Sequence, residues 1–451
     1  MMHGIPLSCV PGVEWPGLPT AAAASLLALQ WQLERSQWWS PERLLEHQFR
    51  QIRALAGHAV ANVPYYRDTL RTAGVARAEE LTPESFRRWP LLPKSLVREN
   101  ESRLRALRYP REHGALMQNY TTGSTGTPLR VFHTEVAQLF AHALVVREHL
   151  LHERDLSAKF GAIRFDAESA TQAGWGLMAT VFATGPACIN STATDLDALL
   201  DWLCEERPAY LLAYPTLLRA LVARSRQTGK APEGLLQILS YGEMLPADLR
   251  TLARECWGVT VVDSYSCHEL ANVAAQCPQH DHYLVHAENV YVEVLRDDGE
   301  PCAPGETGRV VATPLHNFAM PLMRYEIGDY AEAGERCPGG RGLPVLNRVV
   351  GRVRNMLRDP EGRMRWPRLG LAQWSWDLAA IRQFRLVQHS VHEIEALLVL
   401  ERELTESEQE KLSAMLRERL GYPFEIRITR VPAIERRRGE KYEEFVSLLD
   451  G

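Results

Sequence analysis

The middle of the chain alternates short apolar runs with stretches of helical pattern, and this alternation constrains the fold more than any other feature. Helical patterns cover residues 217–223 and the segment that follows Ala247. The apolar runs between them are predicted strands, at 210–214, 236–241 and 259–264. Strands that alternate with helices predict a parallel sheet, whose ligands bind at the carboxyl ends of the strands. Two polar segments follow these strands and are predicted to lie at that edge, 241–243 and 265–269.

The regions on either side have different patterns. Residues 41–108 are rich in helical pattern, and Pro41 directly after Ser40 is typical of a capped helix start. Alternating valines within residues 283–311 predict antiparallel strands. A smaller unit is predicted from strands and a helix near 383–388, 396–400 and 406–420. We therefore predict an α/β chain, α+β overall. A large N-terminal domain of mainly parallel sheets with a β-rich subdomain would span 1–351, and a small C-terminal α+β domain would span 352–451.

Charge and cysteine content narrow the class of protein. The chain has 451 residues, a net charge of −5 and a pI near 6.3. These values argue against nucleic acid or a membrane surface as a partner. Eight cysteines without tight pairing are typical of reduced thiols in the cytoplasm. The apolar run 21–29 is too short to cross a bilayer. We therefore expect a soluble, cytoplasmic protein.

Residues 120–128, Tyr-Thr-Thr-Gly-Ser-Thr-Gly-Thr-Pro, form a loop of hydroxyl and glycine residues before a predicted strand at 129–132. Glycine lets backbone N–H groups gather around an anion, and hydroxyls add further donors. The candidate phosphate-binding residues are Thr121, Thr122, Gly123, Ser124, Thr125 and Gly126. This is not the common phosphate-binding loop, because no lysine follows the second glycine. A surface loop rich in Ser, Thr and Gly is the alternative.

Several further motifs follow this loop in a fixed order. They are 240–246 (Ser-Tyr-Gly-Glu-Met-Leu-Pro), 263–269 (Asp-Ser-Tyr-Ser-Cys-His-Glu), 320–329 (Met-Pro-Leu-Met-Arg-Tyr-Glu-Ile-Gly-Asp), Gly351-Arg352 and Gly439-Glu440-Lys441. The set resembles the adenylate-forming superfamily of acyl-CoA synthetases. Its nearest resemblance is to the phenylacetate-CoA ligase branch, which includes proteins named for capsular polysaccharide biosynthesis. The resemblance extends from Ala61 to Lys441.

The resemblance implies activation of a small carboxylic acid by ATP through an acyl-adenylate, then transfer to a thiol of coenzyme A or of carrier-protein pantetheine. The loop at 121–126 would hold the β- and γ-phosphates, Glu269 would hold Mg²⁺, and Asp329 would accept hydrogen bonds from the ribose. Lys441 would stabilise charge between the carboxylate and the α-phosphate, with Glu269 and His268 as further catalytic residues. The remaining implied ATP-binding residues are Tyr241, Gly242, Glu243, Ser264, Tyr265, Ser266 and Arg352.

Departures from the family pattern keep other functions open. Ser266 replaces a glycine, His268 replaces a hydroxyl residue, and Arg354 replaces an acidic hinge residue. One alternative is transfer of the acyl group to an amine. Another is a non-catalytic relative that binds nucleotide or a partner protein. Each site residue also has a structural alternative: Asp329 as a turn residue, Glu269 as a helix-start carboxylate and Lys441 as part of a solvated charge run.

A separate structural zinc site is a further hypothesis from the resemblance, with the ligand set Cys277, His282, His286 and Cys337. Its alternative is reduced cysteines and exposed histidines. The arginine-rich segment 352–368 could grip the phosphates of coenzyme A or an acidic carrier protein, or form a solvated hinge. The acyl pocket is expected near Tyr214, Tyr241 and 175–178, and the resemblance favours an aromatic or small acid. An acyl carrier protein and a homodimer are further expectations.

Overall fold

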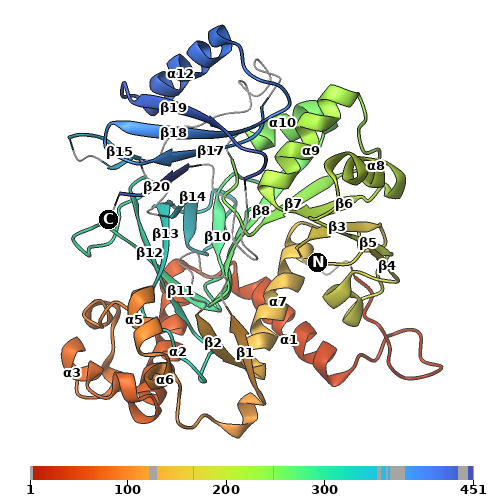
Figure 1. The fold of residues 1–451 in the computed structure, drawn as a ribbon. Coiled ribbons are helices and arrows are strands. Elements are labelled where there is room, and N and C mark those ends of the chain that lie inside the picture. The colour runs from red at the N-terminus through yellow and green to blue at the C-terminus, as the bar shows by residue number, and fades with distance from the viewer. Residues whose placement is uncertain are drawn as a thin grey trace.

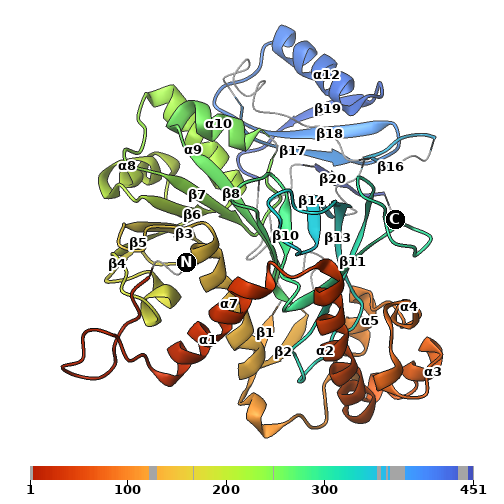
Figure 2. The ribbon, with the colours of Figure 1, turned by 180° about the vertical axis from the view of Figure 1, so that it is seen from behind.

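The computed structural model describes residues 4–120, 129–165, 167–246, 248–352, 357–361, 364–365, 381–434 and 445–449. Most described strands belong to one sheet with the order β11-β12-β13-β14-β10-β9-β8-β7-β6-β3-β5-β4. Figures 1 and 2 show this sheet crossing the molecule, with the helical N-terminal region at one end and a smaller sheet above it. The mixed α/β class predicted from the sequence is confirmed.

One half of the large sheet is parallel and covered by helices, as the strand–helix alternation predicts. The parallel strands are β3 (Phe160–Arg164), β5 (Ala187–Ser191), β6 (Tyr210–Ala213), β7 (Gln237–Tyr241) and β8 (Thr260–Cys267). The short strand β4 (Ala170–Gln172) pairs antiparallel to β5 at the edge, and the 3-10 helix η4 spans Gly176–Thr180. The helices are α8 (Leu196–Glu206), α9 (Pro215–Thr228) and α10 (Leu249–Trp257). Their apolar side chains pack in one core with strands β3, β6, β7 and β8.

The other half of the sheet is antiparallel. It contains β9 (Ala271–Gln276), β10 (Tyr283–Val285), β11 (Val290–Leu295), β12 (Thr307–Pro314), β13 (Tyr325–Ala333) and β14 (Val345–Arg352). Strand β8 joins the two halves, since it pairs parallel with β7 and antiparallel with β9. The prediction that residues 265–269 follow their strand is therefore wrong in part. Pairing with β9 extends β8 through Cys267, and only His268 and Glu269 lie in the turn.

The N-terminal region supplies helices to both halves of the sheet: the first long helix shares a core with the parallel half, and the second shares one with the antiparallel half. The long helices are α1 (Ala21–Ser36) and α2 (Pro41–Asn62), and Ser40 caps α2 as predicted. Short elements follow: η1 (Pro64–Tyr66), α3 (Thr69–Ala73), η2 (Ala78–Glu80), α4 (Pro83–Phe86), α5 (Lys94–Glu99), α6 (Glu101–Leu104) and η3 (Arg111–His113). The hairpin of β1 (Leu116–Tyr120) and β2 (Arg130–Thr134) then leads into α7 (Glu135–Leu151).

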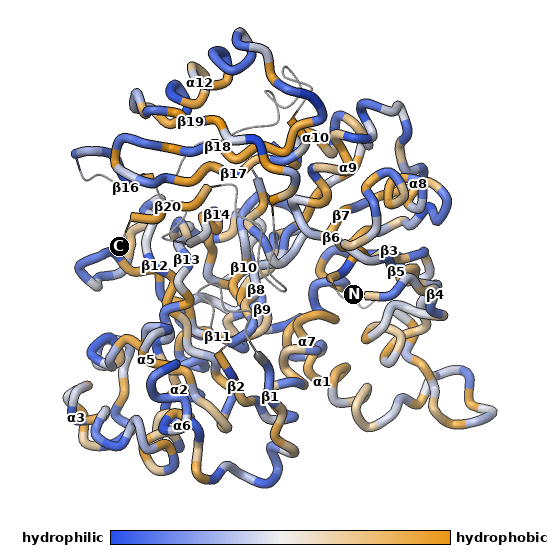
Figure 3. The backbone as a smooth tube through the Cα atoms, in the orientation of Figure 1, coloured by the Kyte–Doolittle hydropathy of each residue, from blue (hydrophilic) through white to orange (hydrophobic). Residues whose placement is uncertain are grey.

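The C-terminal region has a sheet of its own, ordered β19-β18-β17-β20. Its elements are β17 (Ile381–Gln388), β18 (Glu393–Leu400), α12 (Glu406–Leu420), β19 (Glu425–Arg430) and β20 (Phe445–Ser447), and a short pair, β15 (Leu357–Arg358) and β16 (Met364–Arg365), precedes them. Leucines of α12 pack on this sheet in a core whose members all follow residue 356. Figure 3 shows polar residues on the outer turns of α12 and apolar ones along the strands. The domain boundary at 351/352 stays a prediction.

Among the described residues, no helix combines the length and the apolar character that crossing a membrane requires. All eight cysteines are free thiols.

A buried ion pair fixes the segment before α5 against the sheet. Arg324 donates through Nε and Nη2 to the two carboxylate oxygens of Glu293, at 2.9 and 3.0 Å, and through Nη1 to the Trp89 carbonyl at 2.8 Å. Leu92 pairs with the start of β13, since its N–H donates to the Arg324 carbonyl at 2.9 Å. These contacts position Lys94, two residues later.

A second buried carboxylate lies under the middle of the sheet. Asp263 of β8 accepts hydrogen bonds from the hydroxyls of Tyr283, at 2.6 Å, and Ser240. Its backbone N–H donates to the side-chain oxygen of Gln276 at 3.1 Å. Burial raises the pKa of Asp263 to about 6, although both hydroxyls oppose this shift. The network joins β7, β8, β9 and β10 beneath the end of β8.

Replacing Arg324 with Met is expected to lower the free energy of unfolding by about 3–5 kcal/mol, because Glu293 is left buried without its cation. Urea unfolding measures the change. The matched control is Arg348→Met, which breaks an ion pair with Glu332 in which the arginine side chain is 65% exposed. It should cost less than about 1 kcal/mol. Equal losses in the two variants would contradict an anchoring role for Arg324.

The raised pKa of Asp263 predicts that the free energy of unfolding falls as the pH rises from about 4 to about 6. The unfolded chain releases this proton near 3.8, whereas the folded chain keeps it to about 6. Each pH unit in this window therefore reduces the contribution of Asp263 by about 1.4 kcal/mol. Urea unfolding at several pH values should show a shallower fall for Asp263→Asn. The exposed Asp297→Asn serves as control. A profile of Asp263→Asn identical to that of the unsubstituted protein would contradict the assignment.

Candidate functional site

The side chain of Glu269 is buried in the turn between β8 and β9 and is held by two residues from other parts of the chain. Lys94 Nζ lies 2.7 Å from Oε1, and the Tyr325 hydroxyl donates to the same oxygen at 2.9 Å. Glu269 as a residue is 4% exposed, and the Lys94 side chain is 28% exposed. Lys94 and Tyr325 are therefore the structural partners of the predicted metal-binding carboxylate.

The charge of Glu269 follows from these partners. Burial alone would raise the pKa of its carboxyl, but the charge of Lys94 and the hydrogen bonds from Lys94 and Tyr325 lower it below its usual value. The group is thus an ionised carboxylate at neutral pH, in a place where water hardly reaches it. Ionised carboxylate oxygens are the ligands that Mg²⁺ prefers. The ammonium of Lys94 already lies where a cation is favoured, so the residues present fit a metal at this position.

Asp329 lies beside this centre on β13. The hydroxyl of Tyr265 donates to Asp329 Oδ2 at 3.0 Å. The backbone of Asp329 pairs with that of Arg352 across β13 and β14, between two glycines in the left-handed region, Gly328 and Gly351. Tyr265 is 7% exposed, so the protein covers most of the residue. The structure thus brings Tyr265, Glu269 and Asp329 together at the end of β8.

The segment 241–243 lies at the end of the neighbouring strand β7. The rings of Tyr241 and Tyr214 stack with their centroids 4.6 Å apart. Gly242 has φ +77°, and a Cβ there would lie 3.1 Å from the Tyr214 ring, so only glycine fits without strain. The Glu243 carboxylate accepts from the Thr216 backbone N–H at 3.0 Å and from its hydroxyl at 2.6 Å. Glu243 therefore fixes this loop to the start of α9.

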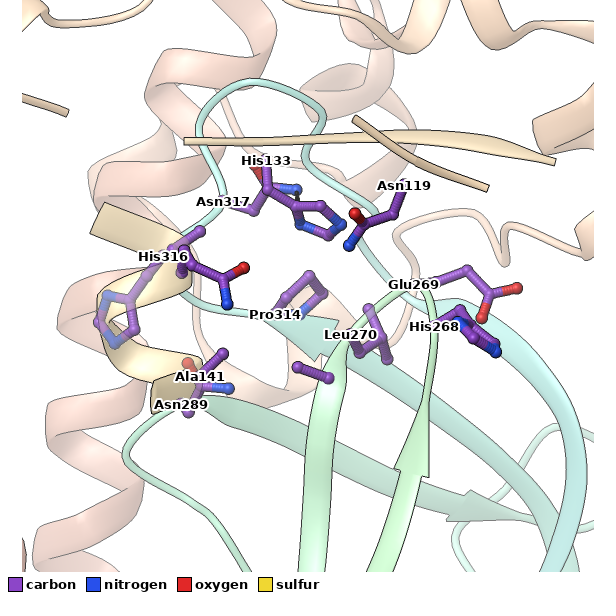
Figure 4. A pocket seen from close by; sticks show the side chains of 13 residues that line it. Asn119, His133, Ala141, His268, Glu269, Leu270, Asn289, Pro314, His316 and Asn317 are labelled. Carbon is purple, nitrogen blue, oxygen red and sulfur yellow. Dashed lines mark hydrogen bonds between the residues drawn. The ribbon is translucent and has the colours of Figure 1, made fainter. Parts of the chain in front are cut away.

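The other described site residues lie along β8 and its turn. The Ser264 hydroxyl donates to Glu148 of α7. Ser266 pairs with Asn272 of β9 within the hairpin. His268 is exposed and, with Glu269, lines a pocket of about 50 Å³ below the turn. Figure 4 shows this pocket between the β8–β9 turn, the β1–β2 hairpin and α7.

Three of the proposed zinc ligands come together away from this centre. The ligand atoms of Cys277, His282 and Cys337 lie within 4.8 Å of one another. Nε2 of His282 is buried without a hydrogen-bond partner among the described residues. His286 is not in this group, which corrects the predicted ligand set. His286 is 2% exposed, and its burial, followed by the charge of Arg147, lowers its pKa well below the usual value.

Several predicted residues lie outside the described part of the chain. These are Lys441, Arg354 and the loop residues Thr121, Thr122, Gly123, Ser124, Thr125 and Gly126, and the side chain of Arg352 is likewise not described. Their roles stay predictions. Sequence reasoning missed Lys94 and assigned no role to Tyr325. Lys94 is separated from Glu269 by 175 positions, so no local pattern could have linked them.

Comparisons with known proteins identify a family and several relatives of this chain. The AMP-binding enzyme family matches residues 49–317. A phenylacetate-coenzyme A ligase of Thermus thermophilus is 27% identical over 338 residues, which are 70% of this chain and 72% of that protein. The Escherichia coli protein of the same name is 24% identical over 349 residues, covering 70% and 73%.

Solved structures show the fold. A 2-hydroxyisobutyryl-CoA ligase in its postadenylation state superposes with a TM-score of 0.72 at 18% identity, over 92% of this chain and 91% of that one. The same ligase in its thioesterification state superposes with a TM-score of 0.58 at 19% identity, over the same shares of the two chains. Because the family matches more than half of the sequence, this chain belongs to the AMP-binding enzyme family of adenylate-forming enzymes, and within that family it is similar to phenylacetate-CoA ligases.

Proposed function

We propose that this ligase activates a small carboxylic acid with ATP at the centre formed by Glu269, Tyr265 and Asp329. The observation that carries the proposal is the buried, ionised carboxylate of Glu269 at the carboxyl end of β8. It lies beside the long, partly exposed side chain of Lys94. A free carboxylate is a poor acyl donor. Its attack on the α-phosphate of ATP releases pyrophosphate and gives an acyl-adenylate, from which a thiol displaces AMP. Such a transfer is accelerated mainly by positioning and by neutralisation of phosphate charge.

Each residue has a defined task in this proposal. Asp329, oriented by the Tyr265 hydroxyl, accepts hydrogen bonds from the ribose. Glu269 holds magnesium, which when bound would neutralise charge on the phosphates. Lys94 is partly exposed, so its ammonium can turn from Glu269 to a phosphate oxygen. Lys441 and the loop 121–126 complete the site by resemblance to the family.

The acceptor thiol is that of coenzyme A, with a carrier-protein pantetheine as the variant, and the arginine-rich segment would suit the phosphates of the first or an acidic surface on the second. The two states of the 2-hydroxyisobutyryl-CoA ligase support movement of a small C-terminal domain between the half-reactions. They are the same protein, so their different TM-scores against this chain reflect different arrangements of its parts. The homodimer and the cytoplasmic location stay predictions from the sequence.

Replacing Lys441 with Ala is expected to reduce carboxylate-dependent exchange of pyrophosphate into ATP by about 10²–10³-fold, because one donor to the developing charge is lost. Equilibrium binding of ATP, measured by calorimetry, should change little. The matched control is Lys411→Ala, which removes an exposed lysine of α12. Its exchange rate should equal that of the unsubstituted protein.

Two results would contradict this account in different ways. Unchanged exchange in Lys441→Ala would remove that residue from its role. If the unsubstituted protein binds ATP but supports no exchange with a broad panel of acids, the chain is a non-catalytic relative.

We also propose that Cys277, His282 and Cys337 hold a structural zinc ion. Two thiolates and an imidazole are three of the four protein ligands that a structural zinc site usually has. Elemental analysis of chelator-washed protein should give about one zinc per chain, and Cys337→Ser should lose it. Cys204→Ser, on α8, is the control and should retain the metal. Washed protein without zinc would show that the idea is wrong.

A further inference from the structure

The pocket below Glu269 is lined by both polar and apolar side chains. Thirteen described residues line it, and eight of these have polar side chains. Its apolar contacts come from small or compact residues, including Ala137, Ala141 and Pro314. Asn119 and His268 are exposed at its mouth, whereas Asn289 is 7% exposed on the opposite side. A ligand in this pocket would therefore contact Glu269 at one end and meet carboxamides and imidazoles along its length.

The hydrogen bonds of Asn317 determine which nitrogen of the His133 ring carries the proton. Asn317 lies behind His133, and its Oδ1 accepts from the Ala319 N–H at 3.2 Å, while Nδ2 donates to the Phe132 and Met320 carbonyls at 2.8 and 3.2 Å. These contacts orient the Asn317 amide, so its NH₂ faces Nδ1 of His133 at 3.4 Å. An amide nitrogen cannot accept a hydrogen bond, so a proton on Nδ1 would have no acceptor there, and the neutral imidazole carries its proton on Nε2. His133 Nε2–H is thus a donor.

Among the described residues, this donor has no acceptor. His133 is 9% exposed, and its Nε2 is buried without a hydrogen-bond partner among the described residues. Figure 4 shows the ring directed toward Asn119, across the pocket from Glu269. A buried donor without an acceptor costs about 1–3 kcal/mol. A ligand whose oxygen accepts from Nε2–H removes this cost, so it should bind more favourably by that amount than a ligand with a methyl group in the same place.

The size of the pocket selects against an aromatic ring. Its volume is about 50 Å³, whereas a cavity that holds a benzene ring is apolar and measures about 150 Å³. A hydroxyl-bearing group of two or three carbon atoms fits the smaller volume. The alanines and Pro314 can contact its carbon atoms while His133 and the asparagines contact its oxygen.

We infer that this pocket receives the acyl part of the acid and selects a small acyl group that carries a hydroxyl group, rather than an aromatic or purely aliphatic one. The inference rests on the proposed function, because it places the acyl group beside the carboxylate that would hold the metal of ATP. The pocket also lies next to the predicted phosphate loop, since Asn119 is two residues before Thr121.

The test compares pairs of acids that differ only in the exchange of a hydroxyl for a methyl group: lactate with isobutyrate, and 3-hydroxybutyrate with isovalerate. Phenylacetate is the aromatic probe. Pyrophosphate exchange into ATP gives kcat/KM for each acid. At least one hydroxy acid should exceed its methyl partner by about 100-fold or more, because sites built to bind a hydroxyl discriminate strongly against analogues without it. Phenylacetate should be slower than that hydroxy acid.

Variants of His133 connect this preference to the pocket. His133→Leu should reduce kcat/KM for the hydroxy acid by about 10-fold or more, the equivalent of one lost hydrogen bond, with little change for the methyl partner. His133→Gln keeps an N–H donor and should retain most of the preference. His392→Leu, which replaces an exposed histidine of the C-terminal sheet region, is the control and should change neither acid.

The outcomes separate the inference from the function on which it rests. No exchange with any acid would reject the proposed function. Exchange that favours phenylacetate or the methyl partners would overturn the inference while the function stands, and this result needs no variant to fold. Equal losses for both acids of a pair in His133→Leu would likewise overturn it.

Discussion

A carboxylate that is 4% exposed needs a nearby cation or donors to stay ionised, and Glu269 receives both. Lys94 comes from the N-terminal helical region, and Tyr325 comes from the start of β13. Both depend on the Arg324–Glu293 ion pair and on the pairing of Leu92 with β13, which fix the two segments to each other. The position of the Glu269 carboxylate is therefore a property of the whole large sheet and its helical cover.

Two buried acids of the same strand and turn illustrate how surroundings set charge. Burial acts to raise the pKa of both Asp263 and Glu269. The hydrogen-bond partners of Asp263 are hydroxyls, and its pKa stays raised. Lys94 lies beside Glu269, and there the pKa is lowered. The first acid holds strands together, whereas the second remains a charged ligand at the edge where ATP is proposed to bind.

Local signals predicted the elements better than the contacts. Helix α12 has the predicted bounds because Thr405 caps its start and Gly421 ends it, and α2 begins after Ser40 as expected. The extension of β8 to Cys267 depends on pairing with β9, and nothing in its own sequence marks it. Likewise, the Lys94 contact, the separation of His286 from the cysteines and the orientation of His133 by Asn317 all depend on residues far apart in the chain.

The most direct measurement is a crystal structure of the protein with magnesium and a non-hydrolysable ATP analogue. The account predicts phosphates against residues 121–126, the ribose hydroxyls on Asp329, and Glu269 on the metal with Lys94 turned toward a phosphate oxygen. A nucleotide bound elsewhere, with the Lys94–Glu269 contact unchanged at 2.7 Å, would contradict it.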